Sequence, residues 1–488
     1  MKNKLIGIIA GLVCCAVFGG AILFMSMSDS KPDVHGQDST EQSSQESSQE
    51  EFTHQSGTIT SREDISSVTV TSGGKSYTAS VAANGIPEIN ELKGIKQNLR
   101  LANALISMCS KIQPYRLVEE NAQDLKKYGL AEPSGVGEIV YKDKTKVRIL
   151  VGDRSPSEED YAYACVDGQK TVWLVENSVW LYLTGKAEDM VSVQMSPLLE
   201  KTASADAKMV ITKKGADGTV LERKDDKWKM TAPINAELDM QKASACVNGL
   251  YGLNAEYCEC IRPDKDKLAE YGLKEPAVTV GFKEGTAELE LYIGNAVKRN
   301  DESEKEKYYC YLKGSEDTDC IYAVAKEYLP WVEITAQEIV SEVMLPNYLV
   351  NLKRITVAAA GKTTEYVITN EGGDSSRINE DISKMRTASV TSGGKELELI
   401  KFRKFYELLM KCPTNRIFTQ DVNSEAYITV VYNKNDGTAD RLELVKAGEG
   451  LGARVNGKMS YLVPESWADA VIADIDALAQ EKELRTEF

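Results

Sequence analysis

The chain has 488 residues, with 74 Asp and Glu against 58 Lys and Arg, so its formal net charge is -16. This acidic balance gives no reason to expect a nucleic-acid binder, because such proteins need a basic face that neutralises phosphates. At roughly 100–200 residues per domain, the length predicts about three domains.

An uncharged apolar run, Leu5 to Met25, lies close to the start of the chain. It is long enough for a helix across a hydrocarbon core of about 30 Å, so residues 1–28 are predicted to form a cytoplasmic tip and a transmembrane anchor. Lys2 and Lys4 precede the run. The positive-inside rule then places the N-terminus in the cytoplasm and the bulk of the chain outside. A cleaved signal peptide is the alternative, but its apolar region is usually only about 7–15 residues long.

Residues 29–60 consist mainly of Ser, Gln, Glu and Asp, as in STEQSSQESSQEE. This composition offers too little apolar surface to offset the entropy lost on ordering. The sequence therefore predicts a disordered acidic linker, which would hold the folded part near a membrane without fixing its orientation.

The remainder of the chain repeats itself at a spacing of about 142–145 residues. LKKYGLAEP around Tyr128 matches LAEYGLKEP around Tyr271, and Cys165 in YAYACV matches Cys310 in KYYCYL. Several landmarks at one spacing indicate internal duplication. We expect repeat modules at 61–205 and 206–348 and a divergent third module at 349–488, which lacks the YGL…P pattern.

The second module gives the clearest pattern. It predicts a hairpin over 210–223, an amphipathic helix after the capping residue Asp239, and a short helix from about Asp264 to Tyr271. Two further hairpins, forming an antiparallel meander, and a final helix starting near Lys326 complete it. The predicted fold class is α+β: three tandem α+β modules with antiparallel meanders, preceded by one transmembrane helix.

The YGL…P motif is interpreted as a helix stop and not as a binding site. Glycine suits the left-handed position that ends a helix, the following leucine can fold back on the helix, and proline prevents its continuation. The motif residues are Tyr128, Gly129, Leu130 and Pro133 in the first module and Tyr271, Gly272, Leu273 and Pro276 in the second.

Catalytic patterns are sparse. The only histidines, His35 and His54, lie in the predicted linker, which excludes Ser-His and Cys-His nucleophiles in the modules. VTSGGK at 70–75 resembles half of a phosphate loop, but a hairpin turn explains it better. Acidic runs at 158–160 and 302–306 could serve glycoside hydrolysis if two acids met in one cleft, although charged loops are usually solvated surface.

Eight cysteines follow the predicted anchor, in a compartment where disulfides persist. Cys310 and Cys320 flank a predicted hairpin turn and form a possible disulfide. The pair Cys258-x-Cys260 is too local to bind a metal alone, and neither a second such pair nor a histidine completes it. We expect neither a metal nor a cofactor.

Tyrosines are the remaining candidate for ligand contact. Tyr161 and Tyr163 should share one strand face, as should Tyr309 and Tyr311. Such a face could stack on sugars or contact a partner, although ordinary sheet packing would place tyrosines there equally well.

The architecture resembles bacterial proteins that carry the domain of unknown function 4340. The resemblance rests on Trp228, Pro233 and Asp239, followed by the YGL…P residues of the first two modules. Family members are often associated with ABC-transporter and gliding-motility-like auxiliary components, so the resemblance implies an accessory role and supplies no catalytic residue.

We therefore expect a membrane-tethered extracytoplasmic binding or scaffold protein, auxiliary to an ABC-transporter or envelope complex, and not an enzyme. Repeated modules on a tether raise the effective concentration near the membrane, which suits multivalent contact. The alternatives are a carboxylate-dependent hydrolase of the cell envelope, which needs two converging acids, and a solute receptor, which needs one deep pocket.

Overall fold

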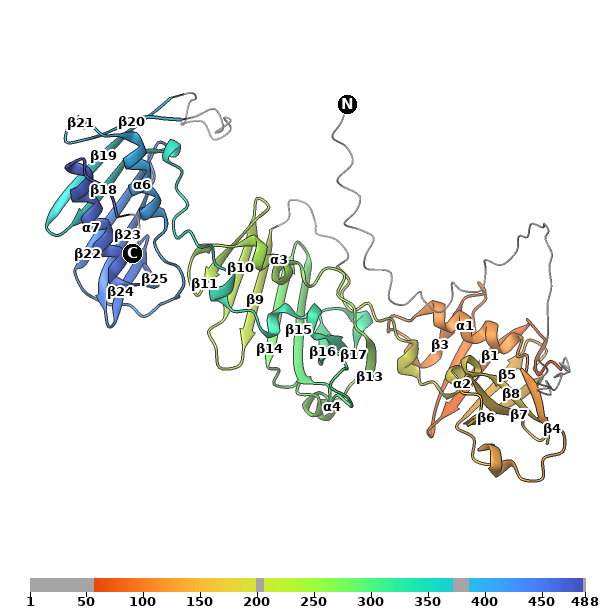
Figure 1. Ribbon diagram of the computed structural model, residues 1–488. Coiled ribbons are helices and arrows are strands. Elements are labelled where there is room, and N and C mark those ends of the chain that lie inside the picture. Colours follow the sequence, from red (N-terminus) through yellow and green to blue (C-terminus); the bar gives the residue numbers. More distant parts are fainter. Residues whose placement is uncertain (1–56, 199–205, 372–385, 486–488) are drawn as a thin grey trace, which may run out of the picture. The chain divides into compact units, whose positions relative to one another are not determined.

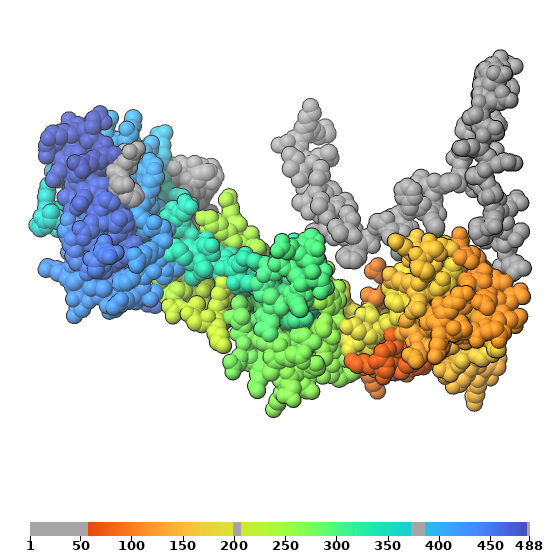
Figure 2. Space-filling model, turned by 60° about the horizontal axis from the view of Figure 1, so that its bottom comes forward, coloured from red at the N-terminus to blue at the C-terminus, as the bar shows by residue number. Residues whose placement is uncertain are grey.

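The computed structural model describes residues 57–198, 206–371 and 386–485. These residues form three large antiparallel sheets, each covered by short helices (Figure 1). In the space-filling view the sheets with their helices are the orange, green and blue bodies (Figure 2). The predicted anchor run Leu5–Met25 lies outside the described residues, as does most of the predicted linker.

The first sheet has eight strands in the order β3-β2-β1-β5-β6-β7-β8-β4. Its strands are β1 (Ile65–Ser72), β2 (Lys75–Val81), β3 (Pro87–Ile89), β4 (Arg116–Glu119), β5 (Gly135–Tyr141), β6 (Lys146–Arg154), β7 (Tyr161–Val166) and β8 (Val172–Glu176). Helices α1 (Leu99–Ser110) and α2 (Asn177–Thr184) pack against β1. Ile59 and Thr60, in the predicted linker, contact the backbone of Ile112 in this body.

The second sheet has nine strands in the order β12-β11-β10-β9-β14-β15-β16-β17-β13. Its strands are β9 (Ala207–Lys213), β10 (Thr219–Lys224), β11 (Lys227–Ala232), β12 (Ala236–Glu237), β13 (Tyr257–Ile261), β14 (Val278–Glu284), β15 (Ala287–Ala296), β16 (Lys307–Lys313) and β17 (Cys320–Ala325). Its helices are α3 (Met240–Asn248), α4 (Lys265–Glu270) and α5 (Ala336–Ile339).

The third sheet has eight strands in the order β21-β20-β19-β18-β22-β23-β24-β25. Its strands are β18 (Leu352–Ala359), β19 (Lys362–Glu371), β20 (Arg386–Ser392), β21 (Lys395–Glu396), β22 (Ala426–Lys434), β23 (Ala439–Ala447), β24 (Gly450–Val455) and β25 (Lys458–Val463). Helices α6 (Leu399–Met410) and α7 (Glu465–Ala479) pack against each other.

One topology recurs in the three sheets. The first strand of each body (β1, β9 or β18) lies between its hairpin partner and the first strand of the meander. The predicted hairpins are confirmed, including the turn of VTSGGK, where Ser72 pairs with Lys75 and Gly73 and Gly74 have positive φ. The domain boundaries at 205/206 and 348/349 stay predictions.

The predicted α+β fold class is wrong, because the described residues are mostly antiparallel β-sheet. The sequence patterns showed the hairpin and the meander, but not the short strands β4, β11 and β13. β4 and β13 are short edge strands that pair with residues remote in the sequence, whereas β11 forms a hairpin with β10 across Asp225 and Asp226. Their addition extends the sheets of the first and second bodies.

One helix predicted for the second body is interrupted. The helix expected near Lys326 is replaced by two 3₁₀ turns, Lys326–Tyr328 and Pro330–Val332, and by α5 of four residues. Pro330 accounts for the break, since it has no N–H for a continuing helix. Among the described residues, no helix is long and apolar enough to cross a membrane.

Buried tryptophans join the helical layers to one another and to the sheets. The Trp331 indole donates to the carbonyl of Cys246 in α3 at 3.1 Å, and Trp467 in α7 donates to Leu408 in α6 at 3.0 Å. Both side chains are fully buried. Burial of an aromatic ring together with a satisfied N–H contributes apolar area without a desolvation cost for the polar atom.

Candidate functional site

The YGL…P residues lie in the turn that follows the 3₁₀ turn Leu125–Tyr128 in the first body and α4 in the second. Gly129 and Gly272 have φ of 66° and 72°. Leu273 donates its N–H to the carbonyl of Leu268 at 2.7 Å, so the chain folds back on α4. Pro133 and Pro276 follow on the way to the next strand. These contacts are internal to each body and give the motif a structural role.

The glycines also permit two backbones to approach closely. A Cβ on Gly272 would clash with the side chain and the backbone nitrogen of Asn295 in β15. A Cβ on Gly294, the residue before Asn295, would clash with the carbonyl of Tyr271. Gly129 and Gly152 face the same constraint in the first body. The sequence identified these glycines as repeat landmarks, but it gave no sign that they meet.

Tyr128 and Tyr271 lie in repeated clusters. The Tyr128 ring is 4.9 Å from that of Tyr163, and the Tyr271 ring is 4.5 Å from that of Tyr309. Their hydroxyls donate to Glu119 at 2.6 Å and to Glu259 at 3.1 Å. Burial, with Glu259 nearby, raises the pKa of Tyr271.

The other two tyrosines considered as ligand contacts also face partners in their own body. The Tyr161 ring stacks on that of Tyr115 at 4.1 Å. The Tyr311 hydroxyl donates to Asp319 at 3.1 Å. These contacts cover one ring face of Tyr161 and engage the hydroxyl of Tyr311.

One acidic run belongs to the first body and the other to the second, and a residue of each pairs with a basic side chain of its own body. Glu158 pairs with Arg116 at 2.6 Å, and Glu306 pairs with Lys326 at 3.2 Å. The Glu306 pKa is lowered, mainly because the carboxylate accepts a hydrogen bond from Tyr308. A general acid for glycoside hydrolysis needs a raised pKa instead.

A buried polar cluster that sequence analysis missed lies inside the second body. Arg223 pairs with Glu284, and their side chains are 0% and 1% exposed. The Tyr251 hydroxyl donates to the same carboxylate at 2.9 Å. Burial and this hydrogen bond raise the pKa of Tyr251 to about 12. Buried ion pairs of this kind are stable only when hydrogen bonds support them.

The eight described cysteines are free thiols, and seven of them are buried. Strand register places Cys310 opposite Tyr322, not opposite Cys320. The disulfide predicted between Cys310 and Cys320 stays a prediction. No cluster of metal-ligating side chains occurs within residues 57–198, 206–371 and 386–485.

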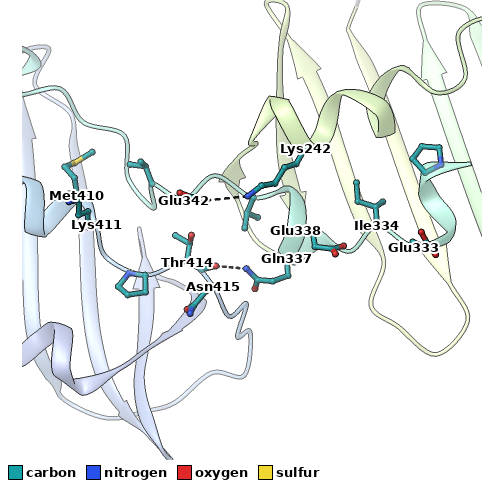
Figure 3. A pocket seen from close by; sticks show the side chains of 14 residues that line it. Lys242, Glu333, Ile334, Gln337, Glu338, Glu342, Met410, Lys411, Thr414 and Asn415 are labelled. Atoms are coloured by element: carbon teal, nitrogen blue, oxygen red, sulfur yellow. Dashed lines mark hydrogen bonds and ion pairs between the residues drawn. The ribbon is translucent and has the colours of Figure 1, made fainter. Parts of the chain in front are cut away.

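An open groove of about 1240 Å³ lies between the segment 330–343 and the end of α6 (Figure 3). We call it the 330–415 groove. Its wall is apolar and its rim is polar. The apolar residues are Pro330, Ile334, Val340, Val343, Met410 and Pro413, and the polar ones are Lys242, Glu333, Gln337, Glu338, Glu342, Lys411, Thr414 and Asn415.

The second sheet fixes one wall of this groove. Besides the bond from Trp331 to α3, the Lys213 ammonium donates to the carbonyls of Val332 at 3.2 Å and Ile334 at 2.6 Å. Burial lowers the pKa of Lys213. Backbone bonding of Ser341 to Glu237 at 2.9 Å holds the far end of the segment.

The Gln337 side chain joins this wall to the loop after α6. Its amide nitrogen donates to the carbonyl of Thr414 at 2.6 Å (Figure 3). Its amide oxygen accepts from the N–H of Ile417 at 2.5 Å. The Thr414 hydroxyl donates to the carbonyl of Ser341 at 3.0 Å. Three hydrogen bonds between two segments remote in sequence set the width of the groove.

Charges on the rim are largely satisfied by neighbours. Lys242 is 3.3 Å from Asp239 and 3.5 Å from Glu342, and Lys411 pairs with Glu407 at 2.6 Å. Backbone and hydroxyl bonds from Thr335 lower the pKa of Glu338. The groove therefore offers apolar contacts bordered by carboxylates, an arrangement suited to binding. Sequence analysis missed it because its two sides belong to different repeats and share no motif.

Comparison with known proteins identified one family. Its model, described as "Domain of unknown function (DUF4340)", matches residues 88–276 and again residues 257–411. Two matches of one model confirm that the chain contains copies of a domain. No curated protein and no solved structure matches the chain.

Proposed function

Because the chain belongs to the family of the domain of unknown function DUF4340, whose description assigns no activity, we propose a function from the geometry of the groove. The protein is a membrane-tethered, extracytoplasmic binding or scaffold protein, auxiliary to a transporter or envelope complex. The 330–415 groove receives an extended polypeptide segment of the partner.

The composition of the groove carries this proposal. Ile334, Val343 and Met410 offer apolar surface in an open channel, which suits side chains of an extended segment better than a small polar solute. Part-buried hydrogen bonds from Gln337 hold the two sides of the groove together. Binding of a partner therefore requires little ordering of the protein.

Charge indicates the chemistry of the segment. The rim has three carboxylates, of which Glu342 pairs with Lys242 and Glu333 with Lys326, while the whole chain has a net charge of -16. A segment with apolar side chains flanked by Lys or Arg is complementary to such a groove, because opposite charges on the two partners favour encounter and register.

The location rests on the N-terminal sequence. The uncharged run Leu5–Met25 follows Lys2 and Lys4, which favours a cytoplasmic N-terminus and an extracytoplasmic folded part. The tether would keep the groove close to membrane partners and raise its effective concentration there.

A photo-crosslinking residue in the groove tests the proposal. We would place it at Val343 in the full chain in native membranes, with a matched position at Ile86, an exposed apolar residue of the first body. We expect a covalent adduct from Val343 and none from Ile86. Mass spectrometry of the adduct should identify an apolar and basic segment of a transporter or envelope protein.

Two substitutions on one helix provide the control. Met410→Arg places a charge in the groove and should abolish the adduct, whereas Ile400→Arg, on an exposed position of α6, should leave it unchanged. Equal adducts from Val343 and Ile86, or an adduct that survives Met410→Arg, would overturn the proposal. Turnover of cell-wall glycans abolished by one acid substitution would favour the hydrolase alternative instead, and a retained small solute would favour a receptor.

A further inference from the structure

Two cysteines meet at one edge of the second sheet. Cys258 lies on the edge strand β13, and Cys320 begins the neighbouring strand β17. Both side chains are buried, and both belong to the same hydrophobic core together with Tyr322. They therefore point to the same face of the sheet.

Strand register makes them diagonal neighbours. Cys258 is opposite Tyr322 and Cys320 is opposite Ile261, with a bulge between Cys258 and Cys260. A bulge increases the local twist, which brings one diagonal pair of side chains closer. The two thiols are near enough for a side-chain hydrogen bond, which together with burial raises the pKa of Cys258.

We propose that Cys258 and Cys320 form a disulfide that fastens β13 to β17 in the mature protein. This inference rests on the extracytoplasmic location proposed above, where disulfides persist. The two thiols lose two protons and two electrons as the S–S bond forms. The electrons reduce the disulfide of a thiol–disulfide oxidoreductase to two thiols.

The pairing excludes the bond between Cys310 and Cys320 suggested by sequence spacing. Cys310 lies on β16, on the other side of β17, and is also opposite Tyr322. Its thiol donates to the carbonyl of Tyr308 at 3.7 Å. Cys258, on the opposite side of β17 from Cys310, is therefore the partner that we assign to Cys320.

The burial of both thiols indicates when the disulfide forms during folding. Since both thiols are enclosed in the folded sheet, the bond should form while β13 docks and not by oxidation of the finished body. The reduced chain is therefore tested by refolding it in the presence of oxidant.

The test uses the full chain in detergent, unfolded, reduced and refolded in a glutathione redox buffer, then alkylated and digested with trypsin without reduction. Cys246, Cys258 and Cys260 fall in peptide 243–265, Cys320 in peptide 314–326 and Cys310 in peptide 308–313. We expect 314–326 to be linked to 243–265. Linkage of 314–326 to 308–313, or alkylation of Cys320, overturns the proposal.

Two serine variants identify which cysteine of peptide 243–265 is bonded to Cys320. Cys258→Ser should remove the link, whereas Cys260→Ser, two residues away on the same strand, should leave it. A link that persists in Cys258→Ser contradicts the assignment. The same peptide mapping, applied to protein isolated from cells, tests the disulfide and the extracytoplasmic location separately. A bond that forms on refolding but not in cells supports the pairing and contradicts the extracytoplasmic location.

Discussion

Arg223 and Glu284 illustrate how much a single residue can contribute in this chain. Both side chains are inside the second body, where an unpaired charge is costly, and Tyr251 supplies the further hydrogen bond that the carboxylate requires. Neither residue stands out in the sequence, because each lies in a strand with many other charged side chains. Only the pairing of β9 with both β10 and β14 places them together.

Replacing the carboxylate should therefore destabilise the second body strongly. We expect Glu284→Gln to lower the free energy of unfolding by about 3–5 kcal/mol, because it leaves the Arg223 charge buried without its counter-ion. Tyr251→Phe removes one hydrogen bond to a charged group and should cost roughly 1.5–3 kcal/mol. Urea unfolding followed by tryptophan fluorescence measures both; equal costs would contradict this account.

At the scale of elements, α4 ends where two backbones touch. The sequence predicted the short helix and the reversal at Gly272, because the left-handed glycine has a local cause in backbone conformation, and the structure adds the cap at Asp264. It could not predict that Gly294 of β15 lies against that reversal, since a contact between remote glycines leaves no periodic pattern. The same limit applies to β4 and β13, whose strand character depends on partners at the sheet edge.

Two glycine substitutions separate the cost of the left-handed backbone conformation from the cost of the close backbone approach. Gly272→Ala should lower the free energy of unfolding by more than the roughly 1–2 kcal/mol that the left-handed conformation costs, because its Cβ also meets Asn295. Gly285→Ala has a similar positive φ in open space and should show the conformational cost alone. Chemical denaturation of the two variants compares them, and an equal loss would show that the close approach is unimportant.

At the scale of the whole molecule, the bodies are joined by specific polar contacts. The Arg262 guanidinium donates to the carbonyls of Glu91 at 2.6 Å and Lys93 at 2.5 Å, and the N–H of Lys96 donates to Asp317 at 2.9 Å. Arg262 has a φ of 45°, unusual for a side chain of this size. Sequence analysis predicted the repeats but none of these contacts, because the contacts depend on the shapes of two folded surfaces.

Removal of this side chain should loosen the first junction and leave the third body unaffected. We expect Arg262→Ala to speed amide hydrogen exchange at residues 91–97, with β22 to β25 unchanged. Arg299→Ala, another arginine of the second body, is the control and should have no effect at 91–97. Unchanged exchange in Arg262→Ala would mean that the junction is held by other contacts.

The strand order also has a practical consequence for anyone who trims this chain. A fragment cut at the limits of the first family match, from Glu88 to Pro276, would discard β1 and β2 and stop before β14. Since β1 bonds to β5 and β14 bonds to β9, β5 and β9 would become exposed edge strands. Their unpaired N–H and C=O groups would promote aggregation. Soluble expression will depend on cutting between completed ladders, not where sequence similarity begins and ends.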